Sequence, residues 1–256
     1  MMELYNYPKY YEIAFSFRDI KQELDVFEDC FKRFSKTPVK KVLELGSGTS
    51  PHLEELTKRG YEYIGIDINE KMLDYAKNKA QNLGISANFI KADMRNFSLG
   101  TPVDFVYIML GSLYAETTED LFSHFNSVAQ ALNPGGLYFL DWCINFQWDE
   151  ALKKEDSWSM EQEGIKVEVK FINEDVINRA TQVCKHKLIM DVDDKGEKLH
   201  LETEEINRTI FPQEFLLLVE KSKKFEFVGW WNNWNLEEPI EKAEHISRPI
   251  TLVRRI

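Results

Sequence analysis

The residues best placed to do chemistry are two glycines and two acids in the first third of the chain. Gly46 and Gly48 directly follow the apolar run 42–45, and Glu44 lies within that run. Glycines after a strand let the backbone turn sharply and approach a ligand closely, while the next helix directs its positive N-terminal end toward that ligand. Asp67 ends the next apolar run, where an acid can bind ribose hydroxyls. The spacing therefore predicts a site for a ribose-containing ligand.

The residue at position 51 distinguishes between the two ligands that fit this spacing, a dinucleotide and S-adenosylmethionine. The dinucleotide fingerprint needs a third glycine there, beside the pyrophosphate, but the residue is Pro51. Glu44 places a carboxylate beside the turn, which repels a pyrophosphate and attracts an ammonium and a sulfonium. The sequence therefore favours S-adenosylmethionine.

Alternating short apolar runs and amphipathic segments must position these residues. Strands are expected over 42–45, 61–67, 88–91, 103–110 and 137–142, with helices over 50–59, 69–83 and 121–132. Ser50 and Pro51 are expected to begin the first of these helices, and Asn69 is expected to cap the second. The rhythm predicts an α/β, Rossmann-like, seven-stranded and mostly parallel sheet with helices on both faces.

The pattern changes after about residue 145. The segments 166–172, 182–191 and 198–211 are β-like, which predicts an antiparallel β insertion after strand five. A helix over 212–222 and strands over 225–231 and 249–255 are expected to follow. The charges of the insertion, Glu202, Glu204 and Glu205 beside Arg208, are interpreted as a solvated sheet face.

The whole chain, residues 1–256, is interpreted as a single domain with four parts. These are an N-terminal helical cofactor lid (1–40), a cofactor-binding core (41–144), the antiparallel insertion (145–211) and the final helix and strands (212–256).

Three motifs in this order resemble those of class I S-adenosylmethionine-dependent methyltransferases, in the small-molecule N/O-methyltransferase-like branch. Val42–Thr49 looks like the first motif, Gly65–Leu73 like the second and Lys91–Met94 like the third, and Asn133–Gly136 precedes the fifth strand. The family pattern E-x-G-x-G-x-G is departed from only at its last glycine, here Ser50. The resemblance implies S-adenosylmethionine as the cofactor and S-adenosylhomocysteine as the product.

The resemblance also implies roles for single residues. The cofactor-binding residues that it implies are Tyr11, Arg18, Glu44, Gly46, Ser47, Gly48, Asp67, Ile68, Met72, Asp93, Met94 and Leu110. Among them, Asp67 takes the ribose hydroxyls, Asp93 accepts from the adenine amino group, and Tyr11 or Arg18 meets the methionine carboxylate. Three alternatives stay open, because Met72 fits a core position equally well, Asp93 fits the role of a cap, and Arg18 fits a surface ion pair.

The acceptor pocket is expected from segments beyond the strand ends. The substrate-binding candidates are Tyr114, Trp142, Asn145 and Trp231, since aromatic walls suit a cationic or planar acceptor. For Trp231 the alternative is a core contact. The catalytic base is unknown, with Tyr114 and His245 as candidates. The five histidines show no metal-ligand spacing, so no metal is expected.

Composition limits the partners. The chain has 32 Lys plus Arg against 43 Asp plus Glu, a formal net charge of −11, which disfavours broad contact with polyphosphate backbones. No apolar run approaches the roughly 18 residues of a membrane span. The spacing of Cys30, Cys143 and Cys184 indicates reduced thiols and a cytoplasmic protein.

The expected function is methyl transfer to N or O of a small-molecule acceptor by a monomer or homodimer, without direct nucleic-acid or membrane contact. The alternatives are a protein or RNA methyltransferase acting with a partner, and a non-catalytic relative that only binds the cofactor. An insertion of this kind either covers the substrate pocket or makes a dimer contact.

Overall fold

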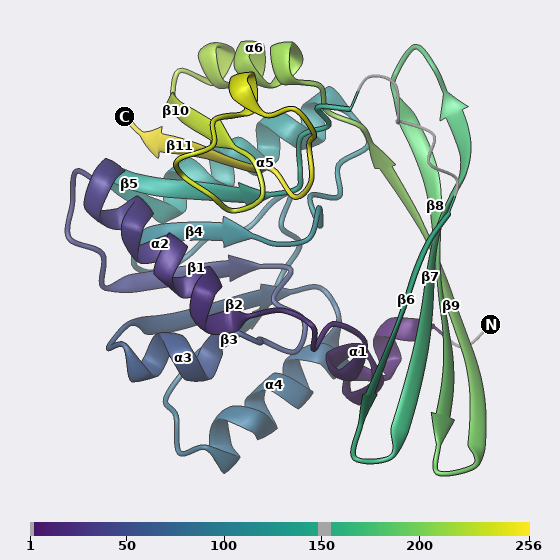
Figure 1. Cartoon of the computed structure of the whole chain (residues 1–256). Helices are drawn as coiled ribbons and strands as arrows, with labels where there is room; N and C mark the ends of the chain where they lie inside the picture. The colour runs from purple at the N-terminus through teal and green to yellow at the C-terminus, as the bar shows by residue number, and fades with distance from the viewer. Residues whose placement is uncertain (1–2, 148–154) are drawn as a thin grey trace.

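The computed structural model describes residues 3–147 and 155–256 and contains two separate sheets (Figure 1). The first sheet has seven strands in the order β10-β11-β5-β4-β1-β2-β3. Its strands are β1 (Lys41–Leu45), β2 (Glu62–Asp67), β3 (Asn88–Lys91), β4 (Val103–Ile108), β5 (Leu132–Asp141), β10 (Phe225–Trp231) and β11 (Ile250–Arg255). Strand β11 pairs antiparallel with both β10 and β5 and so runs against the direction of the other six strands. The other pairs are parallel, so the predicted mostly parallel seven-stranded sheet is confirmed.

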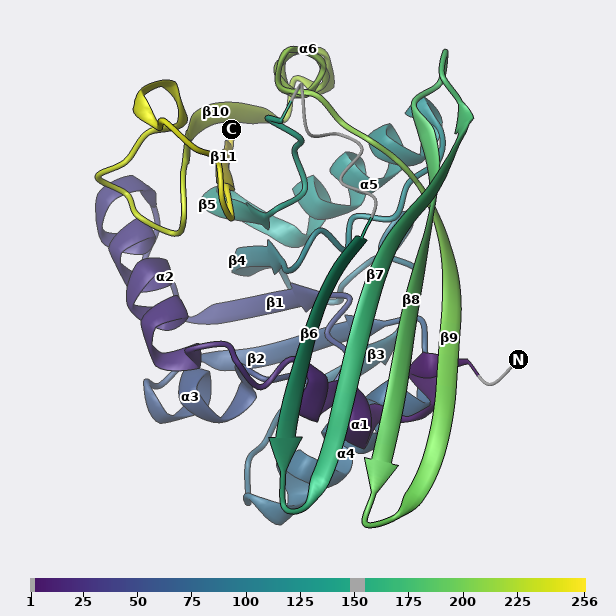
Figure 2. The same ribbon diagram turned by 45° about the vertical axis from the view of Figure 1, so that its right-hand side comes forward.

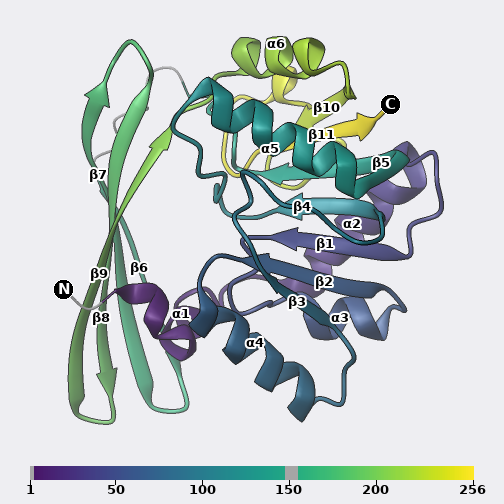
Figure 3. The same ribbon diagram turned by 180° about the vertical axis from the view of Figure 1, so that it is seen from behind.

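Helices cover both faces of this sheet, as the apolar periodicity predicts. On one face lie α2 (Ile20–Phe34) and α3 (Leu53–Lys58), and on the other α5 (Thr118–Ala131) and α6 (Pro212–Ser222) (Figures 1 and 3). The helix α4 (Glu70–Asn82) packs beside β2 and β3. Strand β4 is buried along its whole length, as expected for a central strand covered on both faces.

Two helix starts test the predicted caps. The side chain of Asn69 accepts a hydrogen bond from the Met72 amide at 3.1 Å, so its capping role is confirmed. The prediction for Ser50 is wrong, because α3 begins only at Leu53. Three residues after β1 have left-handed backbone conformations, namely Gly46, Gly48 and Ser50 (φ 52°). Because these residues form a wide turn, the helix starts later in the chain than predicted.

The inserted sheet has four strands in the order β6-β7-β8-β9 and stands beside the carboxyl edge of the first sheet (Figure 2). Its strands are β6 (Glu155–Gln162), β7 (Ile165–Asn178), β8 (Val183–Asp194) and β9 (Glu197–Arg208). The antiparallel insertion is thus confirmed, but β6 was not predicted. That edge strand is almost entirely exposed, so its sequence carries little of the apolar alternation that reveals a strand.

The N-terminal segment divides between the two sheets. A short 3-10 helix, η1 (Leu4–Asn6), and α1 (Pro8–Ala14) pack against the apolar face of the insertion. The indole Nε1 of Trp158 donates to the Ala14 carbonyl at 2.8 Å. By contrast, Leu24 and Phe27 of α2 lie in the core of the first sheet. Within the expected lid, only η1 and α1 therefore lie between the two sheets.

Two remaining features bear on the partners. Among residues 3–147 and 155–256, no helix combines the length and apolarity needed to cross a bilayer. Cys30, Cys143 and Cys184 are free thiols.

The final short 3-10 helix, η2 (Ile240–Lys242), lies in the loop between β10 and β11.

Candidate active site

The turn after β1 and the acid at the end of β2 meet directly. The Asp67 carboxylate accepts hydrogen bonds from the Gly48 amide through Oδ2 and from the Asn69 amide through Oδ1, each at 2.8 Å. Parallel strands bring their carboxyl ends to one edge of the sheet, which is why residues 19 positions apart in the sequence are neighbours. Asp67 thereby fixes the shape of the turn.

Asp67 is partly buried and can accept further hydrogen bonds. Burial raises its pKa, the amides of Asn69 and Gly48 lower it, and the nearby charge of Glu44 raises it, so that the net shift is upward. Each carboxylate oxygen accepts one of these amides, and an ionised carboxylate has about four acceptor positions. The two hydroxyls of a ribose are donors that suit the remaining positions.

The backbone at Gly46 leaves little room for a side chain. A Cβ there would lie 3.1 Å from Cε of Met94 and 3.8 Å from Cβ of Ser112, at a φ of +64°. A Cβ at Gly48 would lie 3.9 Å from Cε1 of Tyr11. The structure therefore brings Tyr11, Met94 and the segment after β4 together around the predicted glycine turn.

Glu44 is buried rather than open to the turn. Its Oε2 accepts hydrogen bonds from the hydroxyls of Tyr63 (2.5 Å) and Tyr107 (3.0 Å), and its Oε1 lies 3.5 Å from Nδ1 of His52. The carboxylate is thus held by three side chains from neighbouring elements. A role toward the cofactor would act through its charge, and it stays a prediction.

Arg18 belongs to a buried ion pair. Its guanidinium lies 2.5 Å from the Glu23 carboxylate and 3.0 Å from Nε2 of His52, and its side chain is 4% exposed. The alternative of a surface pair is therefore wrong. Its predicted contact with a methionine carboxylate would have to share the guanidinium with Glu23.

A second arginine extends this buried network, and no local pattern in the sequence predicts it. Arg248 Nη1 contacts Glu23 at 2.8 Å and its Nη2 contacts Asp141 at 2.6 Å. Asp141, at the end of β5 and fully buried, also accepts from the Trp234 indole at 2.9 Å and the Leu110 amide at 2.8 Å. Through that amide the network fixes the backbone where β4 ends, beside the glycine turn.

The other predicted cofactor residues divide by exposure. Ile68 is 65% exposed directly after Asp67 and leaves an apolar side chain open for a ligand, whereas Met72 is 1% exposed, which favours the core alternative. Ser47 is buried. Asp93 pairs with Arg95 at 2.6 Å. The hydrogen bond from Arg95 lowers the pKa of Asp93 more than burial raises it, so this carboxylate is charged and already partnered.

The acceptor candidates do not all gather at one place. Trp142 is 50% exposed after β5, and Asn145 Oδ1 accepts from the Gln147 amide at 2.9 Å. Trp231 is only 9% exposed, with its ring centroid 5.3 Å from that of Phe34, which favours the core alternative. His245 is exposed, and its carbonyl accepts from the Asn232 side chain.

Tyr114 lies beside the inserted sheet, and this corrects the interpretation of the insertion's charges as a solvated face. Arg208 at the end of β9 donates its amide to the Ala115 carbonyl at 2.9 Å, and its guanidinium pairs with Glu214. Glu205 accepts a hydrogen bond from the Tyr5 hydroxyl and lies beside Tyr114, whose pKa it raises together with burial. The solvated-face interpretation is therefore wrong for Glu205 and Arg208, although it holds for the exposed Glu204.

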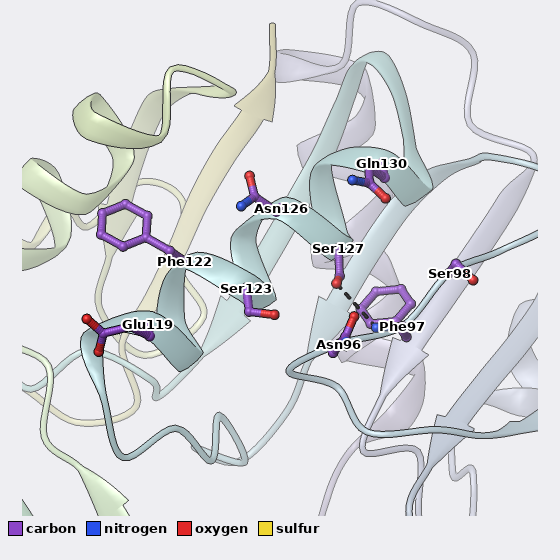
Figure 4. Close-up of a pocket in the computed structure, with 9 residues that line it drawn as sticks. All are labelled: Asn96, Phe97, Ser98, Glu119, Phe122, Ser123, Asn126, Ser127 and Gln130. Carbon is purple, nitrogen blue, oxygen red and sulfur yellow. Dashed lines mark hydrogen bonds between the residues drawn. The ribbon is translucent and has the colours of Figure 1, made fainter.

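A separate hollow of about 570 Å³ lies between α5 and the segment 96–98 (Figure 4). Ser127 of α5 accepts the Phe97 amide there at 3.2 Å. None of the predicted site residues lines this hollow. Within the described parts of the chain, no group of three or more His, Cys, Asp or Glu side chains is arranged to hold a metal ion.

The strand order and the glycine turn at the carboxyl edge define the class of fold as Rossmann-like, with an antiparallel insertion. Residues 42–136 match the family model described as a methyltransferase domain. Over 109 residues the chain is 34% identical to the dTDP-3-amino-3,4,6-trideoxy-alpha-D-glucopyranose N,N-dimethyltransferase of Streptomyces venezuelae, covering 42% of this chain and 44% of that protein. The chain thus matches less than half the length of this curated relative.

Solved structures match over almost the whole chain. An S-adenosylmethionine-dependent methyltransferase from Clostridium acetobutylicum aligns with a TM-score of 0.75 and 18% identity, covering 93% of this chain and 92% of that one. The sugar N-methyltransferase KedS8 from Streptoalloteichus aligns with a TM-score of 0.72 and 19% identity, covering 100% and 94%. These matches establish the fold, and together with the family model they confirm the predicted resemblance to class I methyltransferases.

Proposed function

We propose that the chain is an S-adenosylmethionine-dependent methyltransferase that acts on N or O of a small-molecule acceptor. The observation that carries the proposal is the contact between Asp67 and the Gly48 amide. This contact joins the acid of the second motif to the glycine turn of the first, within the segment that matches the methyltransferase model. The Streptomyces venezuelae relative is named for methylation of an amino sugar nucleotide and KedS8 is named a sugar N-methyltransferase, which supports a small acceptor of that kind.

The residues present fit the cofactor. Gly46 provides a backbone cradle that a Cβ would fill, Asp67 can accept further donors besides its two backbone amides, and the exposed Ile68 can lie against a flat apolar ring. When bound, S-adenosylmethionine supplies an electrophilic methyl group on a sulfonium. Asp67 would hold the ribose, and the glycine turn would hold the methionine part, with Tyr11 covering that turn.

The chain contributes mainly alignment and exclusion of water. A displacement at a methyl group needs its reactants held in line and near contact, which alone can supply much of the rate. Tyr11 of α1 covers the Gly48 side of the turn, and Leu110 and Ser112 lie at the end of β4. An acceptor held near Tyr114 would therefore approach from the side of the inserted sheet.

The remaining expectations are part of the same proposal. A net charge of −11 supports a small-molecule partner over nucleic acid. Free thiols at Cys30, Cys143 and Cys184 support a reducing compartment, the cytoplasm. The protein would act as a monomer or a homodimer.

Titration with S-adenosylhomocysteine tests the proposal directly. The wild type should bind this product analogue, and Asp67→Asn should weaken binding about tenfold or more, since one lost charge-assisted hydrogen bond costs about 1.5–3 kcal/mol. Asp74→Asn, at an exposed site on α4, is the matched control and should bind like the wild type. Absence of binding by the wild type at millimolar ligand would refute the proposal.

A further inference from the structure

The face of the inserted sheet that packs on α1 changes from apolar to polar along the strands. Near α1 it is apolar, with Val167, Met190 and Leu201 buried in the cluster that packs on the N-terminal helix. Further along the same strands the paired residues are polar. Since directly opposed residues share a face of the sheet, Asn173, His186 and Glu205 project from the same face as that apolar cluster.

These polar residues form one connected row. The His186 ring contacts Oδ1 of Asn173 at 2.6 Å and Oδ1 of Asn207 at 2.8 Å, one through each ring nitrogen. Glu205 stands opposite His186 in the ladder. The row crosses β7, β8 and β9 at the end of the sheet where the Arg208 amide bonds to the Ala115 carbonyl.

Three tyrosines connect this row to the glycine turn. The Tyr5 hydroxyl donates to Glu205, and the Tyr5 ring centroid lies 5.7 Å from that of Tyr11. Tyr11 in turn lies against Gly48. Tyr114, from the segment after β4, hydrogen-bonds to the same carboxylate. Glu205 is therefore joined through Tyr5 and Tyr114 to the segments that border the glycine turn.

We propose that Glu205 recognises the nitrogen of an amine acceptor and makes the enzyme an N-methyltransferase. The inference rests on the proposed function above. Methylation of an amine moves positive charge onto the nitrogen, because the lone pair forms the new C–N bond while the electrons of the C–S bond return to sulfur. A fixed carboxylate stabilises charge that develops beside it, and the proton of the resulting ammonium then leaves to solvent.

A hydroxyl acceptor gains less from this arrangement. Its oxygen must give its proton to a base as the C–O bond forms, and a carboxylate, which holds protons only weakly at neutral pH, is a poor base for that proton. The Tyr5 hydroxyl donates to Glu205, and the Tyr114 hydroxyl also hydrogen-bonds to it. These two tyrosines hold the carboxylate in place, and because an ionised carboxylate has about four acceptor positions, it can still accept a hydrogen bond from an acceptor N–H. Glu205 is therefore a specificity residue for nitrogen over oxygen.

The test compares amines with their hydroxyl counterparts in the protein saturated with S-adenosylhomocysteine. The probes are the amino sugar nucleotide named for the Streptomyces venezuelae relative, a panel of primary amines, and the matching alcohols. Calorimetry should show that the wild type prefers an amine and that Glu205→Gln reduces this preference about tenfold or more, as expected for loss of a charge-assisted hydrogen bond. Glu205→Asp should restore part of it.

Glu204→Gln is the matched control. It is the neighbouring residue on the same strand, but it projects to the other face and pairs with Lys185 at 2.7 Å. This variant should keep the amine preference, and all variants should keep their affinity for S-adenosylhomocysteine. An unchanged preference in Glu205→Gln, or a wild type that binds no amine, overturns the inference. Loss of S-adenosylhomocysteine binding by the wild type would instead refute the proposed function.

Discussion

The two sheets use the same strand geometry in opposite ways. In the first sheet β4 is buried on both faces, so its side chains serve the core and the chemistry gathers where the strands end. In the inserted sheet β7 alternates between buried and exposed residues over its first half, so one whole face can serve a site. The first sheet therefore offers backbone turns to a ligand, whereas the second offers a row of side chains.

Charged residues differ between the two regions in the same way. Beside the first sheet, the side chains of Glu23 and Asp141 are 6% and 0% exposed, and they share Arg248 as their cation. On the insertion, the side chain of Glu174 is 26% exposed where it pairs with Lys187 at 3.2 Å. Pairs with a buried carboxylate are costly to break, whereas pairs open to solvent contribute little.

The largest effect is expected from Arg248→Met. Asp141 is fully buried, and removal of its partner leaves two carboxylates without their shared cation. Breaking a buried pair in this way costs about 3–5 kcal/mol. Urea unfolding should show that loss, whereas Lys187→Met in the inserted sheet should change the free energy of unfolding by about 0–1 kcal/mol. Equal losses would mean that the two networks do not differ.

A smaller loss, which depends on pH, is expected from Glu23→Gln. Burial alone would raise the pKa of Glu23, but hydrogen bonds from His52 and Arg18 and the charge of Arg18 hold it well below its ordinary value. A carboxyl with such a depressed pKa adds stability above its unfolded pKa of about 4.3 and loses it as the pH falls toward the folded value.

The difference between the wild type and Glu23→Gln should therefore be about 3 kcal/mol at pH 7 and shrink below about pH 4.3. Unfolding curves from pH 7 to pH 3 measure it. Glu54→Gln, whose partner is the exposed Lys58, should differ from the wild type by about 0.5 kcal/mol or less. A difference for Glu23→Gln that stays constant with pH would contradict the assigned charge.

Alanine variants of two glycines test whether the turn after β1 serves ligand binding as well as folding. Gly46 (φ +64°) lies in the predicted turn and Gly196 (φ +99°) in the hairpin between β8 and β9, where a Cβ would meet nothing within 4 Å. Alanine at either position should cost about 1–2 kcal/mol of stability because of the left-handed backbone. Only Gly46→Ala should also weaken S-adenosylhomocysteine about tenfold, since its methyl group would push on Met94. Calorimetry that finds no difference between the two variants would remove the turn from the site.

The smallest effect is expected from Trp142→Ala. Its ring is half exposed after β5, and an aromatic contact to an acceptor contributes about 0.5–1.5 kcal/mol. The KM for an amine probe should rise about 2–10-fold, with S-adenosylhomocysteine affinity unchanged. Leu217→Ala, at a 64% exposed position of α6, is the control. Equal KM values for the two variants would place Trp142 outside the acceptor site.

Local motifs allowed the cofactor half of the site to be predicted from the sequence. A glycine turn after a strand, a cap such as Asn69 and an acid at the next strand end are all defined by neighbours in the chain, and the sheet brings Asp67 to Gly48 as predicted. The prediction for Ser50 failed because its backbone conformation depends on the whole turn. The buried partners Glu23 and Arg248 lie 225 residues apart, beyond the reach of any local pattern.

The sequence by itself determined the strands and helices of the first sheet and the glycine turn at its edge, because hydrophobic period and turn chemistry are local properties. Only the tertiary structure decided which groups Glu205 contacts. Alternation places Glu204 and Glu205 on opposite faces of β9, but nothing in the strand says which face is covered. Tyr5, 200 residues earlier in the chain, and the docking of Arg208 on Ala115 turn one of those faces toward the site.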